Sequence, residues 1–165
     1  MVTPVTNSYI PDLETASAYF ASDPRATAFI ATPATMTWYL QRATKVIDAL
    51  PLRGRKYYMD GSQERQFPRL YRDGYDMDEA TGISEVPQIV LDACCEEALA
   101  IYLFHADADK SARRKLQEEG VKAYSLGGGY SETFGTSNEG IHNGLKSTEA
   151  YALLSKYIAR SFPIT

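Results

Sequence analysis

An apolar stripe of helical period constrains the fold of this chain more than any other feature. Between residues 36 and 50, apolar residues recur at offsets of 0, 3, 4, 7, 11 and 14. They are Met36, Tyr39, Leu40, Ala43, Ile47 and Leu50. This spacing places them on one side of an α-helix, and that side must be buried against another element. Thr32 with Pro33 at the first position, or Thr35 as a later cap, begins the helix, and Pro51 ends it.

A second long helix is predicted from Pro87 to about His105. Seven apolar residues mark its buried side: Val86, Ile89, Val90, Ala93, Ala100, Ile101 and Phe104. Glu97 interrupts this side, and a buried carboxylate needs a partner. Arg42, on the flank of the helix at 36–50, is a candidate for a structural buried pair with Glu97. The alternative is that Glu97 lies at the edge of the stripe.

Capping residues predict three shorter helices. Asp12, Asp109 and Ser147 each precede a helical segment, at residues 13–21, 110–119 and 148–161 respectively. The apolar residues of the last segment are spread over a wide arc. We therefore expect one side of this C-terminal helix, at about 147–161, to pack on a partner.

Glycines and alternating residues predict a small β element. The segments 121–126 and 130–134 alternate in polarity and flank three consecutive glycines, a pattern typical of a β-hairpin. Together with the helices, this predicts a mainly α fold: a helical bundle with a long connection and a small β-hairpin. The length of 165 residues fits a single domain over 1–165.

The long connection runs from Leu52 to Ser84, where helical periodicity disappears. A structureless loop of this length is unusual in a compact domain, so we expect short elements, including an extended piece around residues 66–71, and an excursion that reaches a partner. Basic residues alternate here with aromatic ones: Arg53, Arg55, Lys56, Arg65, Arg69 and Arg72 with Tyr57, Tyr58, Phe67 and Tyr71. Such a mixture can bind phosphates and stack bases, but arginine and tyrosine also dominate protein interfaces.

The overall charge favours the protein interface. The formal net charge is −4, whereas a dedicated nucleic-acid binder usually presents a basic surface. The 12 tyrosines also suit an interaction surface, because tyrosine combines contact area with a polar tip. The start of the chain lacks the pattern of a secretory signal, and no stretch reaches the length of a membrane span. Cys94 and Cys95 are adjacent, which predicts reduced thiols.

No pattern of catalytic or metal-binding residues has the required spacing. Residues 107–118 resemble a calcium loop, but Ala112 stands at the sixth position, where the turn requires glycine. The acidic residues at 73–79 lack a nearby histidine or cysteine, and neither His105 nor His142 belongs to a nucleophile motif or a metal-binding pair. We therefore predict that the protein is not an enzyme and holds no metal or cofactor.

Several short motifs follow one another in a recognisable order. They are Asn7-Ser8-Tyr9, Ala16-x-x-Tyr19-Phe20, Leu40-x-Arg42-Ala43-Thr44-x-x-Ile47-Asp48, Arg53-Gly54, Phe67-Pro68-Arg69 and Val86-Pro87-x-x-Val90-x-x-Ala93-x-x-Glu96-x-Ala98. In this order they resemble the head–tail connector family of tailed bacteriophages, also called adaptors or head-completion proteins. Some members of that family are catalogued as DnaT-like single-stranded-DNA-binding proteins.

The resemblance implies a structural protein of the virion. Such an adaptor forms a ring, commonly a dodecamer, under the portal protein, extends the channel for double-stranded DNA and docks the tail or a stopper protein. It would be found at the head–tail interface of the virion, and in the host cytoplasm during assembly. The residues predicted to contact partners are Arg53, Arg55, Arg69, Tyr157 and Arg160. The alternative is a single-stranded-DNA-binding replication accessory protein that uses the connection as its stacking groove.

Overall fold

The elements follow the predicted order. The computed structural model describes residues 4–71, 74–75, 85–107, 123–126, 130–133 and 144–159. The elements are α1 (Leu13–Phe20), the short 3₁₀-helix η1 (Pro24–Ala26), α2 (Thr27–Ile30), α3 (Pro33–Asp48), β1 (Arg55–Lys56), β2 (Arg69–Tyr71), β3 (Gly74–Tyr75), α4 (Gln88–Ala106), β4 (Ala123–Leu126), β5 (Tyr130–Thr133) and α6 (Thr148–Leu154). The protein is mainly α-helical with a small β-hairpin, as predicted.

Side chains at the predicted caps begin two of the helices. The Asp12 carboxylate accepts a hydrogen bond of 2.7 Å from the backbone N–H of Thr15 at the start of α1. The Ser147 hydroxyl accepts one of 3.0 Å from the N–H of Ala150 at the start of α6. Each cap satisfies a backbone donor that the first turn of a helix leaves without an internal partner.

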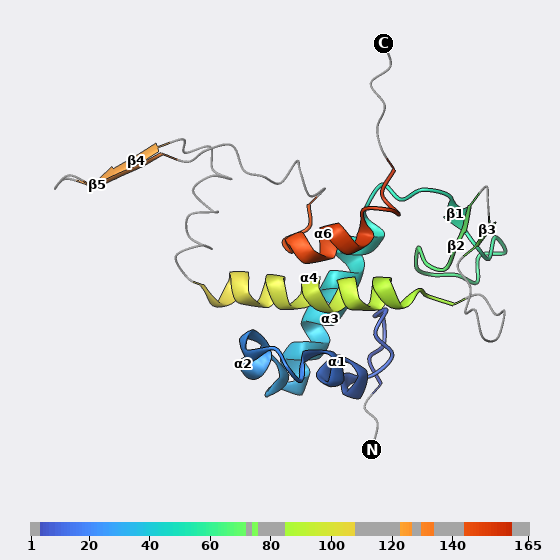
Figure 1. The fold of residues 1–165 in the computed structure, drawn as a ribbon, viewed down its shortest axis with the longest axis horizontal. Helices are drawn as coiled ribbons and strands as arrows, with labels where there is room; N and C mark the ends of the chain where they lie inside the picture. The colour runs from blue at the N-terminus through green and yellow to red at the C-terminus, as the bar shows by residue number, and fades with distance from the viewer. Residues whose placement is uncertain are drawn as a thin grey trace, which may run out of the picture.

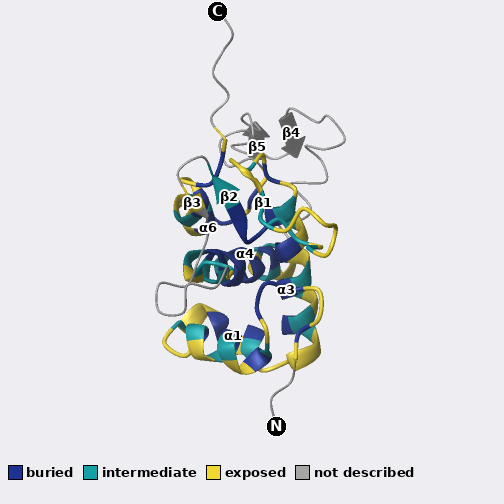
Figure 2. Cartoon of the chain, turned by 90° about the vertical axis from the view of Figure 1, so that its right-hand side faces the viewer, coloured by how far each residue is buried: buried dark blue, intermediate teal, exposed yellow. Residues whose placement is uncertain are grey.

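Helix α4 forms the centre of the molecule. It packs against α3 on one side and α6 on another, and α1 also contacts it (Figure 1). Eight of the 19 residues of α4 are buried, and they are coloured dark blue in Figure 2. The apolar stripe predicted for α3 is confirmed, because Met36, Leu40, Ala43 and Ile47 are fully buried. None of the described helices is long and apolar enough to span a membrane.

The long connection contains a small antiparallel sheet, which confirms the predicted extended piece. Its strand order is β1-β2-β3, with Arg55 paired to Leu70 and Leu70 to Tyr75. Gly54 makes the close approach before β1 possible: its φ is 73°, and an added Cβ would lie 2.4 Å from the carbonyl oxygen of Leu70. A side chain at this position would clash with the neighbouring strand.

The predicted β-hairpin is also confirmed. Strands β4 and β5 pair antiparallel, from Ala123 opposite Thr133 to Leu126 opposite Tyr130. The helix predicted at 110–119 lies outside the described residues.

The final helix is shorter than predicted, and its apolar residues pack within the domain. It ends at Leu154 and not at Ser161, and the chain then turns so that Ile158 forms a β-bridge with Leu52. Tyr157 and Ile158 are buried in the core. The wide apolar arc arises in part because residues after Leu154 leave the helix and reach the core by another path. That one side of α6 packs on a partner stays a prediction.

Candidate functional site

The Arg69 side chain stabilises the fold at the start of the connection through hydrogen bonds. The residue is only 4% exposed, and its guanidinium donates hydrogen bonds to five oxygens, of which the three shortest contacts follow. Nε donates to the carbonyl of Arg53 at 2.6 Å, Nη2 to that of Gly54 at 2.8 Å, and Nη1 to Oε1 of Gln66 at 2.7 Å. The prediction of Arg69 as a partner-contact residue is therefore wrong. Its donors are used to fold the connection, because buried guanidinium groups need acceptors inside the protein.

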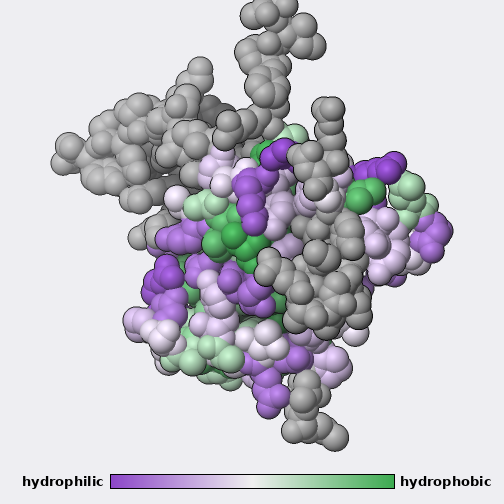
Figure 3. Space-filling model, turned by 45° about the vertical axis from the view of Figure 1, so that its right-hand side comes forward, coloured by the Kyte–Doolittle hydropathy of each residue, from purple (hydrophilic) through white to green (hydrophobic). Residues whose placement is uncertain are grey.

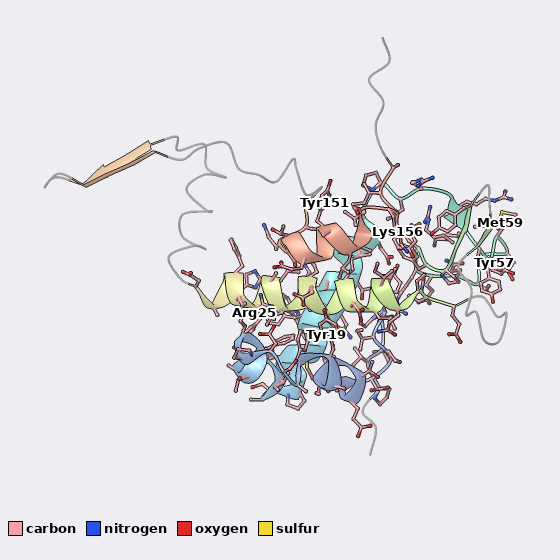
Figure 4. All side chains as sticks on the ribbon, in the orientation of Figure 1. Tyr19, Arg25, Tyr57, Met59, Tyr151 and Lys156 are labelled. Carbon is pink, nitrogen blue, oxygen red and sulfur yellow. The ribbon has the colours of Figure 1, made fainter. Side chains whose placement is uncertain are left out.

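The connection exposes a mixed basic and aromatic surface. We define the connection surface as Arg53, Arg55, Tyr57, Tyr58, Met59 and Lys156. Arg53 and Arg55 are exposed, and their contact with a partner stays a prediction; Tyr58 and Met59 are 44% and 69% exposed. Figure 4 shows Tyr57, Met59 and Lys156 on the same side of the molecule. On the face shown in Figure 3, hydrophilic side chains are interspersed with smaller hydrophobic areas.

Backbone and side-chain hydrogen bonds fix the shape of this surface. The ammonium group of Lys56 donates to the carbonyls of Gln63 and Glu64, both at 2.9 Å, and so closes the turn after β1. The N–H of Tyr58 donates to Oε1 of Gln63 at 3.0 Å, and the rings of Tyr57 and Tyr58 meet edge-to-face with centroids 4.9 Å apart. The exposed Tyr58 ring is therefore presented by a folded turn.

Arg55 is an exposed cation on this surface. Arg53 is anchored, since its Nη1 donates to the carbonyl of Lys156 at 3.2 Å. In contrast, Arg55 forms no ion pair in the part of the chain that the structure describes. Its guanidinium is therefore available to an external anion.

Tyr157 is buried, which overturns the prediction that it contacts a partner. It is 6% exposed, and its ring packs edge-to-face on Phe67 with centroids 5.1 Å apart. The neighbouring Lys156, which the sequence reasoning missed, is exposed and has its ammonium 4.8 Å from the centre of the Tyr157 ring. The only indication of Lys156 in the sequence was its position directly before a tyrosine in the final segment. Arg160 lies outside the described residues.

The structure also corrects the partner predicted for Glu97. Glu97 is fully buried, but its carboxylate accepts hydrogen bonds from the backbone N–H groups of Lys146, at 3.0 Å, and Ser147, at 2.9 Å. Arg42 is exposed on α3. Burial raises the pKa of Glu97 to about 7, although the hydrogen bonds from Lys146 and Ser147 lower it. Glu97 thus joins α4 to the beginning of α6, and sequence alone could not show a backbone partner 50 residues away.

The described residues offer little for metal or thiol chemistry. Among them, no group of three or more histidine, cysteine, aspartate or glutamate side chains could hold a metal ion. Cys94 and Cys95 are free and buried, and burial raises the pKa of the Cys94 thiol to about 11. Such thiols are poor nucleophiles. All four acidic residues of the predicted cluster at 73–79 lie outside the described residues.

Fold and surface together define a small α-helical domain with a folded, basic and aromatic excursion between its two longest helices. A family model described as "Putative DnaT-like ssDNA binding protein" matches residues 1–162, so the chain belongs to this family. The match agrees with the DnaT-like part of the resemblance seen in the sequence, and the head–tail connector part stays a prediction. No curated protein and no solved structure is significantly similar to the chain.

Proposed function

We propose that the protein binds single-stranded DNA through the connection surface. The observation that carries this proposal is the placement of the exposed Arg55 cation on the same folded excursion as the exposed Tyr58 ring. A guanidinium can neutralise a backbone phosphate while an aromatic ring stacks on a base, and neither contact requires a particular sequence. The family to which the chain belongs supports the same function by its description.

The negative net charge does not prevent such binding. The charge of −4 belongs to the whole chain, whereas a strand experiences mainly the charges close to it. At about 0.1 M salt, interactions between exposed charges are largely screened beyond about 10 Å. The charges that matter at this surface are therefore the cations Arg53, Arg55 and Lys156, together with the exposed carboxylates of Asp60 and Glu64 on the same excursion.

The double variant Arg55→Gln, Tyr58→Ala is expected to bind single-stranded DNA at least about tenfold more weakly, because it loses one phosphate contact and one stacking ring. The measurement is the anisotropy of a labelled thymine oligonucleotide over a series of salt concentrations. Losing one phosphate contact should reduce the salt slope of log K by about 0.7.

Arg25→Gln is the matched control for this experiment. Arg25 is also an exposed arginine, but it pairs with Asp23 at 2.7 Å and lies far from Tyr57 and Met59 in Figure 4. The control should bind as the wild type does. Equal affinity of the double variant and the control would contradict the connection surface as the site, and the absence of any binding at low salt would contradict the function.

A second candidate function is that of a head–tail adaptor in a virion. Met59 favours it, because an apolar side chain that is 69% exposed at the tip of a folded excursion suits a protein interface. In this role the same excursion would dock on a portal protein, a stopper or a neighbouring copy in a ring. The protein would act without catalysis, by positioning its partners.

Electron microscopy of the purified protein, with and without a portal protein, tests the adaptor role. The expected result is a ring or a complex with the portal, and Met59→Glu should weaken it by placing a charge in an apolar contact. Monomers alone under both conditions would contradict this role. Binding of single-stranded DNA has no bearing on that outcome.

A further inference from the structure

Helix α3 presents an exposed face that carries an aromatic ring and two cations. The exposed residues of this face recur every three or four positions: Ala34, Trp38, Arg42, Lys45 and Ala49. At 3.6 residues per turn they lie on one side of the helix, opposite the buried stripe. Trp38 and Lys45 are separated by about 10 Å along the helix axis, with Arg42 between them.

The Trp38 ring is held in place although it is 52% exposed. It meets the ring of Tyr39 edge-to-face, with centroids 4.7 Å apart. The Tyr39 hydroxyl lies 3.3 Å from Nδ1 of His105, and its ring also packs on Tyr102 at 5.5 Å. Because its neighbour is fixed from several sides, Trp38 can accept a stacking ligand without a large loss of conformational freedom.

The cations of this face are Arg42 and Lys45. Neither Arg42 nor Lys45 forms an ion pair in the described part of the chain. The one acidic side chain of α3, Asp48, faces elsewhere: it accepts hydrogen bonds from the hydroxyl of Tyr9 and from the backbone N–H of Gln66. The α3 face is therefore basic. Its positive charge complements a polyanion better than it complements a protein surface of mixed charge.

We propose that this α3 face is a second contact for single-stranded DNA, in which a base stacks on Trp38 while Arg42 and Lys45 neutralise neighbouring phosphates. The inference rests on the proposed function but uses none of the residues of the connection surface. Alternating a stacking ring with cations is the arrangement that binds single strands independently of their sequence. The C-terminal end of α3 leads into the connection (Figure 1).

Trp38 fluorescence tests this inference directly, because Trp38 is the one tryptophan among the 165 residues. A thymine oligonucleotide of about 15 nucleotides suits the site sizes of single-strand binders. Adding it to the wild-type protein should quench Trp38 emission over the same concentrations that raise the anisotropy of the labelled oligonucleotide. Trp38→Ala should weaken binding by roughly tenfold, and Arg42→Gln, Lys45→Gln should reduce the salt slope by about 1.4.

The variants of the connection surface supply the control. Arg55→Gln, Tyr58→Ala should shift the quenching curve to higher oligonucleotide concentrations without abolishing quenching at saturation. If the oligonucleotide binds while Trp38 emission and the affinity of Trp38→Ala stay unchanged, the α3 inference is overturned and the proposed function stands. No binding at low salt overturns the proposed function itself. Emission that changes with protein concentration and not with oligonucleotide would make the face a contact between copies, which also overturns the inference.

Discussion

Replacing Glu97 with alanine is expected to lower the free energy of unfolding by about 3 kcal/mol. The carboxylate is the acceptor for the backbone N–H groups of Lys146 and Ser147, and its removal leaves these donors without their partner inside the protein. A cavity left beside the beginning of α6 adds to the loss. Chemical denaturation measures the effect. Glu96→Ala is the comparison variant: it removes the neighbouring carboxylate, which accepts a hydrogen bond of 2.9 Å from the Tyr19 hydroxyl, and a smaller loss of about 1 kcal/mol is expected. An equal loss in both variants would contradict the assigned role of Glu97.

The same residue makes stability depend on pH. In the folded protein, burial raises the pKa of Glu97 from 4.5 to about 7. The folded state therefore retains a proton that the unfolded state releases between about pH 4.5 and 7, so the contribution of this group to stability falls as the pH rises through that range. The shift corresponds to about 3 kcal/mol.

Glu97→Gln isolates this contribution, because glutamine has a similar shape and does not titrate. The difference in unfolding free energy between wild type and Glu97→Gln is expected to fall by about 3 kcal/mol from pH 4.5 to 7 and to stay level above that. Parallel pH profiles for the two proteins would show that Glu97 has an ordinary pKa. The profiles are best compared as a difference, so that the other titrating groups cancel.

Replacing Arg69 with lysine is expected to destabilise the connection by about 3 kcal/mol. A lysine retains the charge, but its single ammonium cannot reach the oxygens of Arg53, Gly54 and Gln66 together, as the planar guanidinium does. Limited proteolysis within residues 52–71 and denaturant unfolding both measure the effect. Arg55→Lys, on the exposed face of β1, should change stability by less than about 0.5 kcal/mol. Equal behaviour of the two lysine variants would show that Arg69 does not fold the connection.

The helices could be predicted from the sequence because their signals are local. The stripe of α3 and the caps at Asp12 and Ser147 involve residues within a few turns of one another. The end of α6 could not be predicted, because Tyr157 and Ile158 keep a helical pattern but form their contacts with the connection. Tertiary packing there overrides the local pattern.

The candidate site was predicted only in part, and the errors share one cause. Arg69 and Tyr157 are residue types common at interfaces, but long amphipathic side chains also fill buried positions when their polar ends find acceptors or packing partners. The Arg42–Glu97 pair was inferred from opposite charge, whereas Glu97 is satisfied by backbone N–H groups that no side-chain pattern reveals. A usable signal for Trp38 did exist, since a large aromatic residue lies outside the apolar stripe of α3, in register with Arg42 and Lys45.

The β-bridge between Leu52 and Ile158 constrains the order in which parts of the domain can fold during synthesis. The N–H of Arg53 donates to the carbonyl of Tyr157 at 2.7 Å, and the N–H of Ala159 donates to that of Pro51 at 2.6 Å. Because the ribosome delivers the N-terminal part first, α3 and α4 can pack while the segment that borders the connection has not yet been made. The surface proposed to bind DNA therefore reaches its final form only after residues 157–159 have left the ribosome, and a nascent chain stalled before that segment would present the α3 face without it.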